Sequence, residues 1–170
     1  MSSRPTEINI EQLPLDLALA RKVMLELASN CGQEMLANFG GAISSELKSD
    51  DSPVSRVDLS NNQRVIDTIT KNFPGHSIVG EEGGLDNSSD FAWVCDPVDG
   101  TCPYIAGIPT SVFALALTYL GTTIMAVIED PYNGGRRYFA ELGKGATVNG
   151  QKINVNSKSE LRLSNIYLDD

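Results

Sequence analysis

The spacing of the apolar residues changes once along this chain, and that change constrains the fold more than any other feature. Between Leu13 and Met35, apolar side chains recur at steps of three and four, which is typical of one face of an amphipathic helix. Pro14 suits the first turn of this helix, and a glycine pair suits its end. A second, shorter helix is predicted over residues 58–73, where a Pro-Gly pair follows.

From residue 77 onward the pattern changes to short β-type runs. These runs cover residues 77–80, 91–95, 111–120, 123–130 and 136–140. Asn149-Gly150 is the strongest signal for a tight hairpin turn. Helices followed by a meander predict an α+β fold, in which two amino-terminal helices pack on an antiparallel sheet.

The length of the chain favours one domain, which we expect to cover residues 1–160. Residues 161–168 alternate like the opening of one more strand. We therefore interpret residues 161–170 as the first strand of a second domain that is absent from this chain.

The charge balance is acidic, with 13 Lys+Arg against 22 Asp+Glu and a net charge of −9. This argues against nucleic acid as a partner, because binding a duplex requires neutralisation of its phosphates. No apolar run reaches the roughly 18 residues of a membrane span, and residues 1–7 lack the features of a signal peptide. Three cysteines fit neither a zinc ribbon nor a disulfide scaffold, so a cytoplasmic, reducing location is expected.

The most informative segment runs from Asp96 to Thr101, where a hydrophobic run leads into two carboxylates. Asp96 and Asp99, with Pro97 and Gly100 fixing the turn, can converge on one hard cation such as Mg²⁺. A solvated turn is the alternative, because Asp-Pro and Asp-Gly are common turn formers.

A second acidic element, Glu81 and Glu82, also follows an apolar run and has glycines on both sides. Taken alone, it is equally compatible with a charged surface turn. Two such clusters in one small domain favour a cation between them, because gathered like charges are costly without one.

The order and spacing of these segments resemble the amino-terminal half of the inositol monophosphatase family. The matching segments are Lys48, Asp51, Val57-Asp58, residues 73–77, Gly80-Glu81-Glu82, Trp93, residues 96–101, Gly107, Pro109, residues 143–146 and Asn149-Gly150. The resemblance implies the first half of a layered αβαβα phosphatase fold. It also implies hydrolysis of a small phosphorylated polyol or sugar with two or three Mg²⁺ ions, by a protein that forms a homodimer.

The resemblance assigns metal ligands residue by residue. It implies that Glu81, Asp96 and the backbone carbonyl of Val98 bind the first ion, and that Asp99 serves a second ion together with Asp96. Glu82 matches the second glutamate of the family, although a solvated carboxylate remains the alternative.

Other roles follow from the same resemblance. Thr101 and Asp58 match the pair that activates the attacking water, and Asp58 also suits a helix N-cap. The amides of Gly100 and Thr101 are expected to receive phosphate oxygens. Lys48 and Asp51 match a loop that helps to hold an additional metal ion, although a polar loop needs no such function.

The sequence departs from the family pattern in two places. Cys102-Pro103-Tyr104 replaces the usual asparagine and aromatic, and the Trp-Asp segment that supplies another aspartate in the family does not occur. The isolated chain is therefore expected to show little activity. The alternative is a non-catalytic, truncated family member that binds metal weakly and associates with a partner chain.

Overall fold

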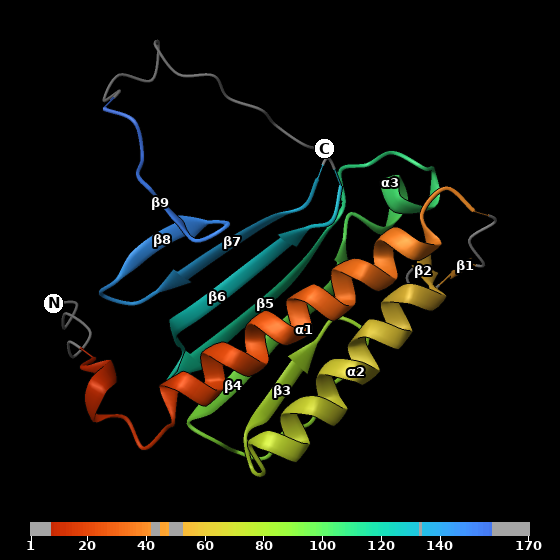
Figure 1. The fold of residues 1–170 in the computed structure, drawn as a ribbon. Helices are drawn as coiled ribbons and strands as arrows, with labels where there is room; N and C mark the ends of the chain where they lie inside the picture. The colour runs from red at the N-terminus through yellow and green to blue at the C-terminus, as the bar shows by residue number, and fades with distance from the viewer. Residues whose placement is uncertain (1–7, 42–44, 48–52, 133, 158–170) are drawn as a thin grey trace, which may run out of the picture.

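The computed structural model describes residues 8–41, 45–47, 53–132 and 134–157. Two long helices lie side by side over one face of a seven-stranded sheet (Figure 1). This arrangement confirms the predicted α+β fold with two amino-terminal helices on a sheet. The elements are η1 (Ile10–Gln12), α1 (Leu17–Asn38), β1 (Ser45–Leu47), β2 (Pro53–Ser55), α2 (Arg56–Asn72), β3 (Ser77–Gly80), β4 (Phe91–Asp99), α3 (Thr101–Ile105), β5 (Val112–Tyr119), β6 (Thr122–Asp130), β7 (Arg136–Glu141), β8 (Gly145–Val148) and β9 (Gln151–Ile153).

Polar caps set the starts of the two long helices. The side chain of Asp16 accepts hydrogen bonds from the amides of Ala18 and Leu19, so α1 begins at Leu17. The prediction that Pro14 lies in the first turn is therefore wrong, and Pro14 precedes the helix. Helix α2 begins after the cap residue Ser55, two residues earlier than predicted.

The strand order of the large sheet follows the chain, from β3 at one edge to β9 at the other. Strands β4 to β9 pair antiparallel, as predicted. Strand β3, however, pairs parallel with β4, so the prediction of a wholly antiparallel sheet is wrong for this pair. Because parallel strands end at the same edge of a sheet, the segments that follow β3 and β4 become neighbours.

The core lies between the two helices and the sheet face that they cover. Side chains on that face include Trp93, Phe113, Leu115 and Leu117, all fully or almost fully buried. The opposite face carries a row of small apolar residues on paired strands, where Val79 and Val94 are 55% and 42% exposed. The row continues through Ala116, Ala126 and Ala140. The described elements therefore leave part of this face in solvent.

The tight turn between β8 and β9 was predicted, whereas two short elements elsewhere were not. Asn149 and Gly150, with φ of 48° and 79°, form the turn between β8 and β9 as their sequence indicates. The short β1–β2 ladder and helix α3 were not predicted. The predicted strand within residues 161–170 lies outside the described residues. Within the described residues, no helix is both long and apolar enough to cross a membrane.

Candidate functional site

The two acidic segments meet at one edge of the sheet, where β3 and β4 end. Gly80 pairs with Cys95 at the end of the parallel ladder. The amide of Glu81 then donates to the carbonyl of Cys95 at 3.1 Å, which extends the ladder by one further bond. Glu81 is thereby held beside Asp96, the residue after Cys95.

A β-bulge places Asp96 and Asp99 on the same side of the sheet. In a regular strand, residues three apart point to opposite faces. Here Asp96 lies opposite Ala114 and Asp99 lies opposite Val112, so β4 contains one extra residue between the two pairs. Because Ala114 and Val112 are two residues apart on β5, their partners Asp96 and Asp99 share one face.

The carboxylates repel one another. The pKa of Asp96 is raised to about 7, first by partial burial and then by the charges of Glu81 and Asp99. A hydrogen bond between the Asp96 and Glu81 side chains raises it further, while the amide of Val98, 3.2 Å from Oδ1 of Asp96, opposes the rise. A cation bound between Asp96 and Glu81 would reduce this repulsion and could take the place of the proton in their hydrogen bond.

Thr101 and Asp58 lie in direct contact beside this pair. The hydroxyl of Thr101 lies 2.9 Å from Oδ1 of Asp58 and 3.0 Å from the backbone oxygen of Val98, and it can donate to either. Asp58 and Val98 are fully buried. Thr101 and Asp58 are 43 positions apart in sequence and are brought together by α2 and the end of β4.

Asp58 is held by the cap of its own helix. Its Oδ2 accepts hydrogen bonds from the amide of Ser55 at 3.0 Å and from the Ser55 hydroxyl. The Ser55 hydroxyl in turn lies within hydrogen-bond distance of the Val57 and Asp58 amides, which completes a capping box. One carboxylate oxygen therefore anchors the helix start while the other faces Thr101. Ser55 was not predicted as part of the site, although a serine three residues before an aspartate is the signal of this cap.

The other predicted site residues are Gly100, Glu82, Lys48 and Asp51. Gly100 adopts a left-handed conformation, with φ of 88°, between Asp99 and α3. Glu82 is half-buried in the turn after β3. Lys48 and Asp51 lie outside the described residues.

Within the described ranges, no group of three or more histidine, cysteine, aspartate or glutamate side chains is arranged to hold a metal ion. The structure instead brings Glu81 and Asp96 together as a pair, with Asp99 near enough to influence the pKa of Asp96. Asp99 is exposed, so a rotamer change is sufficient to reorient its carboxylate.

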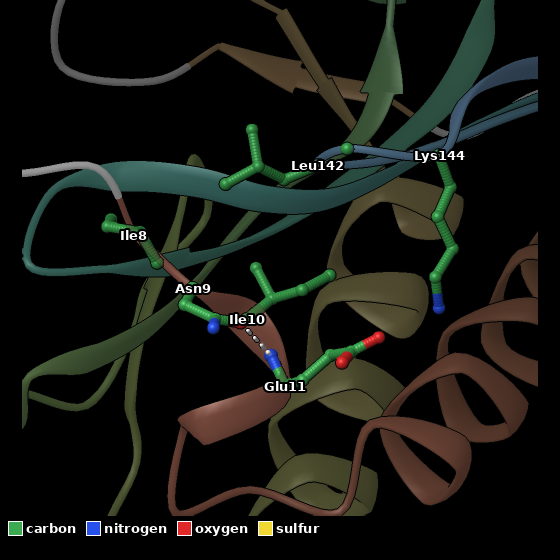
Figure 2. Close-up of a pocket in the computed structure, with 7 residues that line it drawn as sticks. Ile8, Asn9, Ile10, Glu11, Leu142 and Lys144 are labelled. Atoms are coloured by element: carbon green, nitrogen blue, oxygen red, sulfur yellow. Dashed lines mark hydrogen bonds between the residues drawn. The ribbon is translucent and has the colours of Figure 1, made fainter.

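A cavity of about 490 Å³ lies elsewhere, between the η1 segment and the β7–β8 turn. Figure 2 shows Ile8 to Glu11 on one side of it and Leu142 and Lys144 on the other. Lys144 forms an ion pair with Glu141 at 2.5 Å. This cavity contains one acidic side chain and does not bring several carboxylates together, so the strand edge remains the better candidate.

Comparisons with known proteins identify the family of the chain. The family model described as "Inositol monophosphatase family" matches residues 16–168. A Nus factor SuhB of Pseudomonas aeruginosa is 36% identical over 112 residues, which are 64% of this chain and 41% of the relative. A fructose-1,6-bisphosphatase/inositol-1-monophosphatase of Aquifex aeolicus is 34% identical over 138 residues, which are 79% of this chain and 52% of the relative.

A solved structure shows the same fold. The Thermotoga maritima IMPase superposes with a TM-score of 0.73 at 28% identity, covering 82% of this chain and 55% of that one. The chain thus spans about half the length of the relatives that it matches. Since the family model covers most of its residues, the chain belongs to the inositol monophosphatase family.

Proposed function

We propose that this chain supplies the amino-terminal half of the active site of a Mg²⁺-dependent phosphate monoesterase. The observation that supports this most directly is the contact of the Thr101 hydroxyl with the buried carboxylate of Asp58, 2.9 Å away. This contact lies at the sheet edge that also carries the Glu81–Asp96 pair. The combination suits a reaction in which a water is activated next to a bound cation.

The donor set fits Mg²⁺ in its chemistry. Glu81, Asp96, Asp99 and the carbonyl of Val98 are hard oxygen donors, which Mg²⁺ prefers. Partial burial and the charges of Glu81 and Asp99 raise the pKa of Asp96, and a cation beside these carboxylates would favour their ionised form. When bound, two or three Mg²⁺ ions would polarise the phosphate and lower the pKa of a bound water. Glu82, Lys48 and Asp51 are proposed as secondary contributors.

Thr101 and Asp58 orient the attacking water in this proposal. Asp58 accepts from Ser55 through Oδ2, so its Oδ1 remains directed at Thr101. In this proposal the Thr101 hydroxyl donates to Asp58 and not to the Val98 carbonyl, which leaves a hydroxyl lone pair to accept from water. As the water oxygen bonds to phosphorus, its proton passes to Thr101 while the Thr101 proton passes to Asp58. The P–O ester bond breaks in the same displacement, and the leaving alkoxide takes a proton from solvent and departs as the alcohol.

The proposed substrate is a small phosphorylated polyol or sugar. The printed name of the Aquifex aeolicus relative, a fructose-1,6-bisphosphatase/inositol-1-monophosphatase, supports this class. The amides of Gly100 and Thr101, at the turn into α3, are proposed to receive phosphate oxygens. A cytoplasmic location and a homodimer complete the proposal.

The test compares Thr101→Ala with Thr101→Ser, because serine keeps the hydroxyl. In a protein that carries both halves of the proposed site, turnover of a phosphate monoester at millimolar Mg²⁺ should fall by roughly 10² to 10⁴ in the alanine variant and recover substantially in the serine variant. Mg²⁺ affinity, measured by calorimetry, should be nearly unchanged in both. Equal turnover in all three proteins would refute the role of Thr101.

Metal binding is tested separately, so that a chain without measurable turnover still gives an answer. Glu81→Gln removes one proposed ligand, and Asp90→Asn removes an exposed carboxylate just before the opposite end of β4. Mg²⁺ affinity should fall in the first variant and stay constant in the second. Equal affinities would show that Glu81 is not a ligand.

The second candidate is a non-catalytic role in association with a partner chain. The name of the Pseudomonas aeruginosa relative, Nus factor SuhB, favours it, because that name describes no hydrolysis. Mg²⁺ binding without turnover, in a protein that carries both halves of the proposed site with Thr101 and Asp58 intact, would favour this candidate over the first.

A further inference from the structure

Helix α2 contacts three parts of the candidate site within little more than one turn. Asp58 faces Thr101, and the side chains of Asn61 and Asn62 point toward the ends of β4 and β3. Residues three and four apart share one face of a helix, so this face is aligned with the sheet edge. Asparagine is a poor helix former and is rarely buried, which makes two consecutive, almost fully buried asparagines unusual.

Asn61 is hydrogen-bonded to the strand that carries Asp96. Its Nδ2 donates to the carbonyl of Pro97 at 3.3 Å and lies 3.5 Å from the carbonyl of Cys31 in α1. The β-bulge is therefore tied to both helices through one carboxamide.

Asn62 is hydrogen-bonded to the turn that carries Glu81. Its Nδ2 donates to the carbonyl of Gly83 at 3.2 Å. The turn is closed by a bond from the amide of Gly83 to the carbonyl of Gly80 at 3.3 Å. Glu81 lies between these two glycines, so a contact to Gly83 limits where the Glu81 backbone can lie.

Gly80 shows how closely Asn62 packs on this turn. A Cβ at position 80 would overlap Oδ1 of Asn62 and the carbonyl of Gly83. The carboxamide therefore packs against the backbone at the start of the turn while it donates to the end. Only glycine at position 80 permits both contacts.

We propose that Asn62 is a positioning residue of this site: its carboxamide fixes the turn of residues 80–84, and with it Glu81, relative to Asp58 and Asp96. The turn-fixing role stands on the geometry, and its importance for Mg²⁺ rests on the function proposed above. Asn62 is not among the proposed metal ligands or phosphate-binding groups, and its hydrogen bond goes to the backbone of the turn. It acts through the backbone of the turn, as outer-shell residues do when they orient metal ligands.

The experiment compares Asn62→Ala with Asn72→Ala, a matched change on the same helix. The Nδ2 of Asn72 donates to the carbonyl of Thr68 at 2.8 Å, near the opposite end of α2. Backbone amide exchange is measured for residues 81–85 and, as an internal reference, for β6. Mg²⁺ affinity of the same proteins is measured by calorimetry.

In the Asn62→Ala variant we expect exchange at residues 81–85 to accelerate about tenfold, as the loss of one hydrogen bond predicts. Strand β6 should be unaffected, and Asn72→Ala should leave residues 81–85 unchanged. Mg²⁺ affinity should fall about tenfold in Asn62→Ala alone.

Each other result contradicts part of the proposal. Unchanged exchange at residues 81–85 would show that Asn62 does not hold the turn, and equal acceleration in β6 would show that it acts on the whole fold. Faster local exchange with unchanged Mg²⁺ affinity would mean that the turn is held for another reason. If the unmodified chain binds no Mg²⁺, the proposed function fails, while the exchange data still decide whether Asn62 fixes the turn.

Discussion

Replacing Asp96 by asparagine should stabilise the metal-free protein while it removes Mg²⁺ binding. The asparagine side chain imitates the protonated carboxylate, because it keeps the oxygen that accepts from the Val98 amide. It also provides an N–H that can take the place of the proton shared with Glu81. The substitution therefore removes the repulsion among these carboxylates without removing the local hydrogen bonds.

The magnitude follows from the raised pKa. A value of about 7, against the ordinary 3.8, corresponds to about 4 kcal/mol of unfavourable interaction in the ionised state. Solvent around a partly exposed pair screens this interaction, so we expect about 1 to 2 kcal/mol at pH 8. The folded protein binds the Asp96 proton more tightly than the unfolded chain does. The stabilisation from this proton is fully present below pH 3.8. It is lost as the pH rises through about 7.

Urea unfolding in the absence of Mg²⁺, at pH 5 and pH 8, is the assay. The Asp96→Asn protein should be more stable than the unmodified protein at pH 8, and the difference should shrink at pH 5. Saturating Mg²⁺ should reverse the order, because only the unmodified protein gains stability by binding the ion. Asp90→Asn is the control and should not change the stability at either pH. A difference that is absent, or that does not depend on pH, would refute the reasoning.

Three further predictions concern residues around the site and the core. Ser55→Ala should destabilise the protein by about 1 kcal/mol through loss of the α2 cap, and turnover should fall as Asp58 loses the hydrogen bond from the Ser55 hydroxyl, as urea unfolding and a phosphatase assay would show. Gly80→Ala should destabilise by about 1 to 3 kcal/mol, measured in the same way, because a Cβ overlaps the turn. Arg21→Met should destabilise by about 1 to 3 kcal/mol at pH 7, since it removes one of two cations beside the buried carboxylate of Glu141. Burial opposes ionisation of Glu141 but the cations lower its pKa overall, so this loss should diminish as the pH falls through its pKa.

The sequence predicted most of the elements because each has a strong local signal. Periodicity identified both helices, and strand β3 has the bounds that were predicted. The direction of β3 could not be predicted in this way, because an apolar run reads the same in a parallel and an antiparallel pair. The parallel pairing of β3 with β4 is nevertheless what brings Glu81 to Asp96. An antiparallel partner would have placed the two acidic segments at opposite edges.

In the site, too, features with a local sequence signal were predicted, and features set by contacts between distant segments were not. Two acidic clusters after apolar runs were visible in the sequence, and the resemblance to a family paired Thr101 with Asp58. The bulge in β4 was not predicted, because it appears only in the register with β5. Helix α3 was not predicted; Pro103 lies in its first turn, where proline is tolerated.

The extra residue in β4 makes the site depend on residue count as well as on side-chain identity. A substitution scan of Pro97 and Val98 changes packing but keeps the number of residues between Asp96 and Asp99. Deleting either one would remove the bulge and restore strict alternation, so the two aspartates, then two positions apart, would still share one face. The deletion would, however, remove the carbonyl of Pro97 that accepts from Asn61 or the carbonyl of Val98 that lies beside the Thr101 hydroxyl. Every carboxylate would still be present, yet the backbone between the two aspartates would be shorter and would lack one of its two acceptors. Single-residue deletions in this segment should therefore be more damaging than substitutions at the same positions.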